Sequence, residues 1–90
     1  MDFVVERYVP GLSEPELRAA LAGLEAAAAR LRREGVDIHY LGSTFLPSDE
    51  ACFSNFEASS AEAVARANDW TGLPTARVHE AIQLPAGPTR

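Results

Sequence analysis

The sequence has a single cysteine, Cys52, so no disulfide can form within the chain. It shows no CxxC pair, no glycine-rich phosphate-binding loop and no Ser–His–Asp set, which removes the sharper enzyme classes. No apolar run approaches the roughly 18 residues that a membrane span needs. Basic residues are also scarce, because 8 of them stand against 13 acidic ones for a formal net charge of −5. That balance argues against a nucleic-acid binder, which usually carries a basic stripe.

What remains is typical of one small globular domain. Of the 90 residues, 47% are apolar and 23% charged, which is ordinary for a protein with one core. We predict a single domain over residues 1–84 and a flexible C-terminal tail over residues 85–90, which carries proline and glycine. The lone cysteine and the absence of a visible signal peptide predict a cytoplasmic protein.

Periodicity and turn residues predict six elements. A β-rich run over residues 3–9 ends at Pro10-Gly11, and Ser13 and Glu16 form a capping box for a helix that Gly35 ends. The apolar stripe of that helix consists of Leu17, Leu21, Leu24, Ala28 and Leu31. Residues 36–46 and 51–57 form a hairpin around Pro47-Ser48-Asp49-Glu50. A second capping box, Ser59 and Glu62, starts a helix to about Trp70, and residues 75–84 form the last strand.

This order is βαββαβ, which predicts an α+β, ferredoxin-like sandwich. Right-handed crossovers give a four-stranded antiparallel sheet with two helices on one face. The other face stays open. We therefore expect function on that face, and a homodimer of the dimeric α/β-barrel type that covers it.

Strand alternation assigns side chains to the two faces. In the hairpin, Phe45 is expected opposite Cys52, Ser43 opposite Ser54, and Leu41 opposite Phe56, all facing the helices. The same rule sends His39, Ile82 and Leu84 to the helix side, and predicts an ion pair there between Arg7 and Glu80. The open face is expected to hold Val4, Glu6, Tyr8, Ile38, Tyr40, Gly42, Thr44, Phe53, Asn55, Glu57 and His79.

Glu6 and His79 are the chemical candidates of the open face. They form either a general acid–base pair, a partial metal site, or a hydrogen-bonded polar pair at a dimer interface. Tyr8, Tyr40, Phe53 and Asn55 either line a pocket for a small ligand, with Thr44 beside them, or fill a dry interface. Cys52 is expected to be a buried structural thiol, and His39 a rim residue.

The sequence also resembles a known family. The run from Val5 to Gly11, the hairpin residues Tyr40-Leu41 and Ser43-Thr44-Phe45 followed by Cys52-Phe53, and the stretch from Ser60 to Val64 with Asn68 and Gly72-Leu73-Pro74 carry the resemblance. The family consists of small bacterial ferredoxin-like proteins, common in actinobacteria, that are described as nickel-binding. The resemblance implies a dimeric α/β barrel and a divalent metal such as nickel. Many members of the family carry histidines where this chain has Glu6 and Asn68, which are poorer ligands for nickel than imidazole. The resemblance therefore suggests a metal site in this chain only at Glu6 and His79.

Three functions follow as hypotheses. The first is a homodimeric protein that binds a small ligand or divalent metal through the open face. Under this hypothesis the protein is not expected to be an enzyme. The second is a cofactor-free enzyme of the dimeric α/β-barrel type, an isomerase, cyclase or monooxygenase acting on a small organic molecule, with Glu6 or His79 as base. The third is a structural or adaptor protein whose open face binds a partner.

Overall fold

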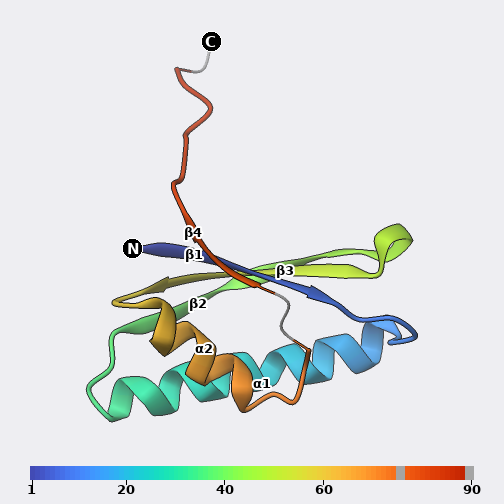
Figure 1. Ribbon diagram of the computed structural model, residues 1–90, viewed down its shortest axis with the longest axis horizontal. Helices are drawn as coiled ribbons and strands as arrows, with labels where there is room; N and C mark the ends of the chain where they lie inside the picture. The colour runs from blue at the N-terminus through green and yellow to red at the C-terminus, as the bar shows by residue number, and fades with distance from the viewer. Residues whose placement is uncertain (75–76, 89–90) are drawn as a thin grey trace.

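The fold is a four-stranded antiparallel sheet with both helices on one side, seen in a computed structural model that describes residues 1–74 and 77–88 (Figure 1). The elements are β1 (Asp2–Tyr8), α1 (Glu14–Arg33), β2 (Ile38–Leu46), β3 (Ala51–Ala58), α2 (Ala61–Asp69) and β4 (Arg77–Ala81). The strand order is β2-β3-β1-β4, with a short 3-10 turn at Pro47–Asp49 between β2 and β3. The predicted ferredoxin-like βαββαβ sandwich is confirmed.

The helix starts follow from local hydrogen bonds. The predicted capping box of α1 is present, since Ser13 Oγ accepts from the Glu16 amide at 3.3 Å and Glu16 Oε1 accepts from the Ser13 amide at 3.1 Å. Gly35 follows the helix with φ +91°, as expected for a left-handed cap. In α2 the cap is Ser60 and not Ser59, because Ser60 is the extended residue whose hydroxyl accepts from the Ala63 amide at 3.2 Å.

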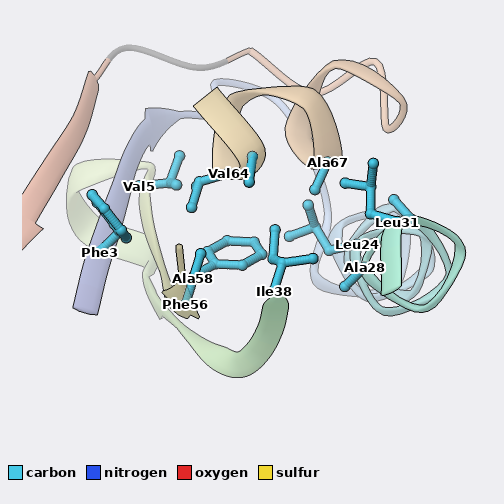
Figure 2. Close-up of a cluster of buried hydrophobic side chains, with 12 residues drawn as sticks. Phe3, Val5, Leu24, Ala28, Leu31, Ile38, Phe56, Ala58, Val64 and Ala67 are labelled. Carbon is cyan, nitrogen blue, oxygen red and sulfur yellow. The ribbon is translucent and has the colours of Figure 1, made fainter. Parts of the chain in front are cut away.

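The core lies between the helices and the sheet (Figure 2). Phe56 of β3 and Val5 of β1 pack there against Leu24 of α1 and Val64 of α2, and all four are fully buried. Leu17 and Cys52 belong to a second, smaller cluster near the β1–α1 turn. The predicted burial of Cys52 is therefore confirmed, and the helix-covered face is an ordinary apolar core.

A β-bulge in β2 corrects the predicted register. Near the turn the pairing is as predicted, with Phe45 opposite Cys52 and Ser43 opposite Ser54, but Tyr40 and not Leu41 lies opposite Phe56. Leu41 is the extra residue of the bulge, and Gly42 beside it has φ +116°. One inserted residue reverses the predicted face of every earlier side chain in β2.

Three side chains on the far side of the bulge change faces as a result. Ile38 and Tyr40 turn toward the helices, where Ile38 is fully buried, so their predicted place on the open face is wrong. His39 turns outward and is exposed, with its Nε2 3.2 Å from Asp37 Oδ1, so its predicted place on the helix side is also wrong.

The last strand is shorter than predicted. It ends at Ala81, which pairs with Asp2, the first residue of β1, so no neighbouring strand remains to extend it. Ile82 and Leu84, predicted to be core residues, are instead 81% and 84% exposed. The predicted start at Thr75 lies outside the described residues. In the described part of the chain, neither helix is both long and apolar enough to span a membrane.

Candidate functional site

The open face is built from alternate residues of all four strands. In register, Val4 lies between Asn55 and His79, and Glu6 lies between Phe53 and Arg77. Facing partners in an antiparallel sheet share one side, so these side chains all point away from the helices. The structure thus brings together on this face most of the predicted site residues: Glu6, Tyr8, Thr44, Phe53, Asn55 and His79.

Glu6 and His79 share the open face, as alternation predicted, and the structure shows them in direct contact. His79 Nε2 lies 3.0 Å from Glu6 Oε1, a diagonal contact between the adjacent strands β1 and β4. The side chains are 25% and 43% exposed, so the pair is only partly covered by its neighbours. A carboxylate and an imidazole at this distance form a hydrogen bond when His79 is neutral and an ion pair when it is protonated.

The surroundings of the pair are mixed. Val4 and Phe53, which neighbour Glu6 and His79 in the register, are half-buried although no helix covers this face. Tyr8 lies nearer one end of the face, Thr44 lies on the edge strand β2 level with Phe53 and Glu6, and both are exposed. The pair therefore has apolar neighbours, Val4 and Phe53, beside the polar Asn55 and Arg77, and it is still open to a ligand or to a second protein.

Tyr40 is the one predicted site residue that does not reach this face. Its ring packs on Phe56 with centroids 5.3 Å apart, and its hydroxyl is hydrogen-bonded to Ser43 Oγ on the helix side. The bulge at Leu41 is the cause, because it reverses the facing of Tyr40.

A buried arginine on the helix side is the centre of a hydrogen-bond network that the sequence did not predict. Arg7 is fully buried and donates to Asn68 Oδ1, to Ser54 Oγ at 3.4 Å and to the Pro74 carbonyl at 3.4 Å. Asn68 in turn donates to the Val64 carbonyl at 2.8 Å. The predicted Arg7–Glu80 ion pair is wrong, because Glu80 lies opposite Phe3 and is exposed.

The network around Arg7 holds a charge without a carboxylate partner among the described residues. Burial lowers the pKa of the Arg7 guanidinium, while the neighbouring Cys52 and Tyr40 act in the opposite direction. Its Nε has no hydrogen-bond partner within residues 1–74 and 77–88. Asn68, a polar residue on the apolar side of α2, was the sequence signal for this network. The network joins β1 to α2 directly behind Glu6.

As a metal site, one chain is incomplete. No group of three or more His, Cys, Asp or Glu side chains converges within the described part of the chain, so Glu6 and His79 stand as a pair. One imidazole nitrogen and one carboxylate oxygen suit nickel or zinc chemically. However, protein zinc sites use three or four protein ligands, and octahedral metals need more donors still.

The strand order, the helix-covered face and the open face define a ferredoxin-like α+β domain. The chain belongs to the family of nickel responsive proteins described as SCO4226-like, whose family model matches residues 3–81. The sequence resemblance to a small bacterial family linked to nickel is therefore confirmed.

The fold is similar to that in the crystal structure of SCO4226 from Streptomyces coelicolor A3(2), with a TM-score of 0.73. The match covers 94% of this chain and 100% of that chain at 20% sequence identity, and at this identity it establishes the shared fold alone. No curated protein matches the sequence.

Proposed function

We propose that this protein is a small homodimeric binding protein that holds a divalent metal such as nickel between the open sheet faces of two copies. The observation that carries the proposal is the contact of 3.0 Å between Glu6 and His79 on a face that no helix covers. Membership of the nickel responsive family supports the choice of metal. The single, buried cysteine fits the cytoplasmic location expected from the sequence.

Incomplete ligation is the argument for a dimer. The described part of one copy brings two metal-ligating side chains together, and a second copy facing it would contribute further donors. Asn55 and Thr44 carry oxygen donors on the same face, and a facing copy would bring them toward Glu6 and His79. The half-buried Val4 and Phe53 would exclude water around the metal once two faces are joined.

The chemistry of the pair sets a condition on binding. A metal would replace the hydrogen shared between His79 Nε2 and Glu6 Oε1, so both groups must be deprotonated to bind it. We therefore expect affinity to fall as the pH is lowered, because protons compete with the metal for His79.

Isothermal titration calorimetry with nickel, zinc and copper tests the metal site. We expect binding by the wild-type protein at micromolar metal, and an affinity at least ~10-fold lower in Glu6→Gln and in His79→Ala, since even the loss of a residue that only orients a ligand costs that much. His39→Ala is the matched control, because His39 also contacts a carboxylate but lies exposed beside Asp37. Absence of binding at micromolar metal, or equal affinities in all four proteins, would sink the proposal.

Size-exclusion chromatography with light scattering tests the dimer separately. A homodimer has twice the 9.7 kDa mass of the chain. The enzyme alternative instead needs a cavity around Glu6, which two facing copies would have to enclose. The grooves seen in the structure lie on the helix side, for example between α1 and β2 beside Leu21 and Ser43.

A further inference from the structure

A shallow groove lies on the helix side of the sheet, between α1 and the edge strand β2 (Figure 1). It consists of two adjoining hollows of about 300 and 490 Å³, which share Leu21 and Ser43 in their walls. Hollows of this size are typical of sites for small organic molecules. Glu6 and His79 lie on the other side of the sheet, so the groove is independent of the proposed metal site.

The bulge in β2 gives this groove a polar floor. In a regular strand, residues three apart point to opposite faces, but the extra residue Leu41 brings Tyr40 to the same side as Ser43. The Tyr40 and Ser43 hydroxyls are hydrogen-bonded to each other, and Ser43 Oγ lies 2.7 Å from Ser54 Oγ on β3. Without the bulge, Leu41 would face the groove in place of Tyr40, and the floor would be apolar.

The buried Arg7 fixes the direction of this hydrogen-bond chain. A guanidinium can only donate, so Ser54 Oγ accepts from Arg7 at 3.4 Å. A hydroxyl has one hydrogen, and within residues 1–74 and 77–88 the remaining partner for that of Ser54 is Ser43 Oγ. Ser43 then donates to the Tyr40 hydroxyl, whose own hydrogen has no acceptor left in the described chain. The chain therefore ends in a donor at the groove.

The charges around the groove favour an anion. The hydrogen-bond acceptors of Arg7 in the described chain are uncharged, so its positive charge is not neutralised there, and the hydroxyls that pass on its polarisation become stronger donors. The two glutamates at the rim are each paired with an arginine, Glu14 with Arg18 at 2.9 Å and Glu25 with Arg32 at 3.6 Å. An acidic ligand would therefore meet a buried positive charge and a rim whose negative charges are already compensated.

We propose that this groove binds a small organic acid, whose carboxylate accepts a hydrogen bond from Tyr40 and whose apolar body lies along α1. Leu17, Leu21 and Phe45 line the first hollow and would contact that body. The carboxylate would be the charged acceptor that the chain from Arg7 lacks, and charge-assisted hydrogen bonds are about twice as strong as neutral ones.

An NMR titration of the nitrogen-15-labelled chain with phenylacetate tests the site. A probe of this size is expected to bind with a dissociation constant of about 1–10 mM and to shift the amide signals of Leu21, Gly42 and Ser43. Acetate lacks the apolar body and phenylacetamide lacks the charge, so each should bind at least ~10-fold more weakly. Shifts confined to the open face, no saturable shift, or equal affinities for the three compounds would overturn the proposal.

Two variants locate the carboxylate. Tyr40→Phe keeps the ring that packs on Phe56, so it should fold, which circular dichroism checks, and it should bind phenylacetate at least ~10-fold more weakly. Tyr8→Phe removes the same atom from the opposite face and should stay within about twofold of wild type. Wild-type affinity in Tyr40→Phe, or an equal loss in Tyr8→Phe, would contradict the site.

Ser54→Ala tests the connection to Arg7, because Ser54 joins Arg7 to Ser43. The variant should lose at least ~3-fold of the preference for phenylacetate over phenylacetamide, since the charge no longer acts through the chain. Structural damage alone would weaken both compounds equally, and that result would contradict the role of Arg7 and with it the preference for an acid.

Discussion

Neighbouring residues of β1 have opposite environments on the two faces of the sheet. Arg7 points toward the helices, is fully buried, and is held by the side chains of Asn68 and Ser54. Glu6 points to the other side, is a quarter exposed, and contacts His79. On the covered face, the polar side chains of Arg7 and Asn68 hydrogen-bond to each other and so connect β1 to α2. On the open face, Glu6 and His79 contact each other and retain the capacity to bind a further group.

The largest effect is expected from breaking the network of the covered face. Asn68→Leu has similar volume but removes the acceptor of Arg7, leaving a buried cation underbonded, and should lower the free energy of unfolding by about 3 kcal/mol. Asn55→Leu is the matched change on the open face and should stay within about 0.5 kcal/mol of wild type. Urea unfolding measures both.

The double variant Arg7→Met/Asn68→Leu sharpens the test. Replacing both partners by apolar residues removes the unpaired charge, so most of the lost stability should return. Equal losses in Asn68→Leu and Asn55→Leu would mean that the two faces do not differ in the way proposed, and no recovery in the double variant would mean that packing and not hydrogen bonding dominates at Asn68.

An intermediate effect on the free energy of unfolding is expected at the bulge, which determines the face to which each side chain of β2 points. Gly42 has φ +116° and no atom within 4 Å of an added Cβ, so Gly42→Ala should lose about 2 kcal/mol through backbone strain alone. Gly23 in α1 has an ordinary φ, and its added Cβ would meet Thr71 at a comfortable 3.7 Å. Gly23→Ala should therefore raise the free energy of unfolding by about 0.5–1 kcal/mol.

Nuclear Overhauser contacts between Tyr40 and Phe56 report whether the bulge survives in Gly42→Ala. Their rings pack with centroids 5.3 Å apart only while Tyr40 faces the helices. A Gly42→Ala protein as stable as wild type, with these contacts intact, would show that the left-handed backbone at this position carries no strain.

The smallest effect is expected at the helix caps, which concern the covered face alone. Ser13→Ala should cost about 1 kcal/mol, because the hydroxyl no longer satisfies the Glu16 amide. Hydrogen bonds from the Ser13 hydroxyl and amide hold the pKa of the Glu16 carboxyl below its usual value. A lowered folded-state pKa stabilises the fold above the pKa of the unfolded chain, and this stability is lost as the pH falls through the folded-state pKa.

The difference in stability between wild type and Ser13→Ala should accordingly narrow in acid, which thermal unfolding over a pH series measures. Ser60→Ala is the comparison variant, because its cap lacks the reciprocal glutamate contact and its cost should depend less on pH in this range. Parallel pH profiles for the two variants would contradict the role given to Glu16.

The sequence by itself determined the order of elements, the cap of α1 and its apolar stripe, because these depend on residues within a few positions of each other. It also placed Glu6 and His79 on one face, since a period of two is reliable within a regular strand. Only the tertiary structure decided the rest. The bulge at Leu41 turned Tyr40 to the helix side, the start of β1 ended β4 before Ile82, and Asn68 rather than Glu80 met Arg7. Each of these depends on where a distant segment lies, and pairing between distant segments is set by the packing of the whole domain and not by local spacing.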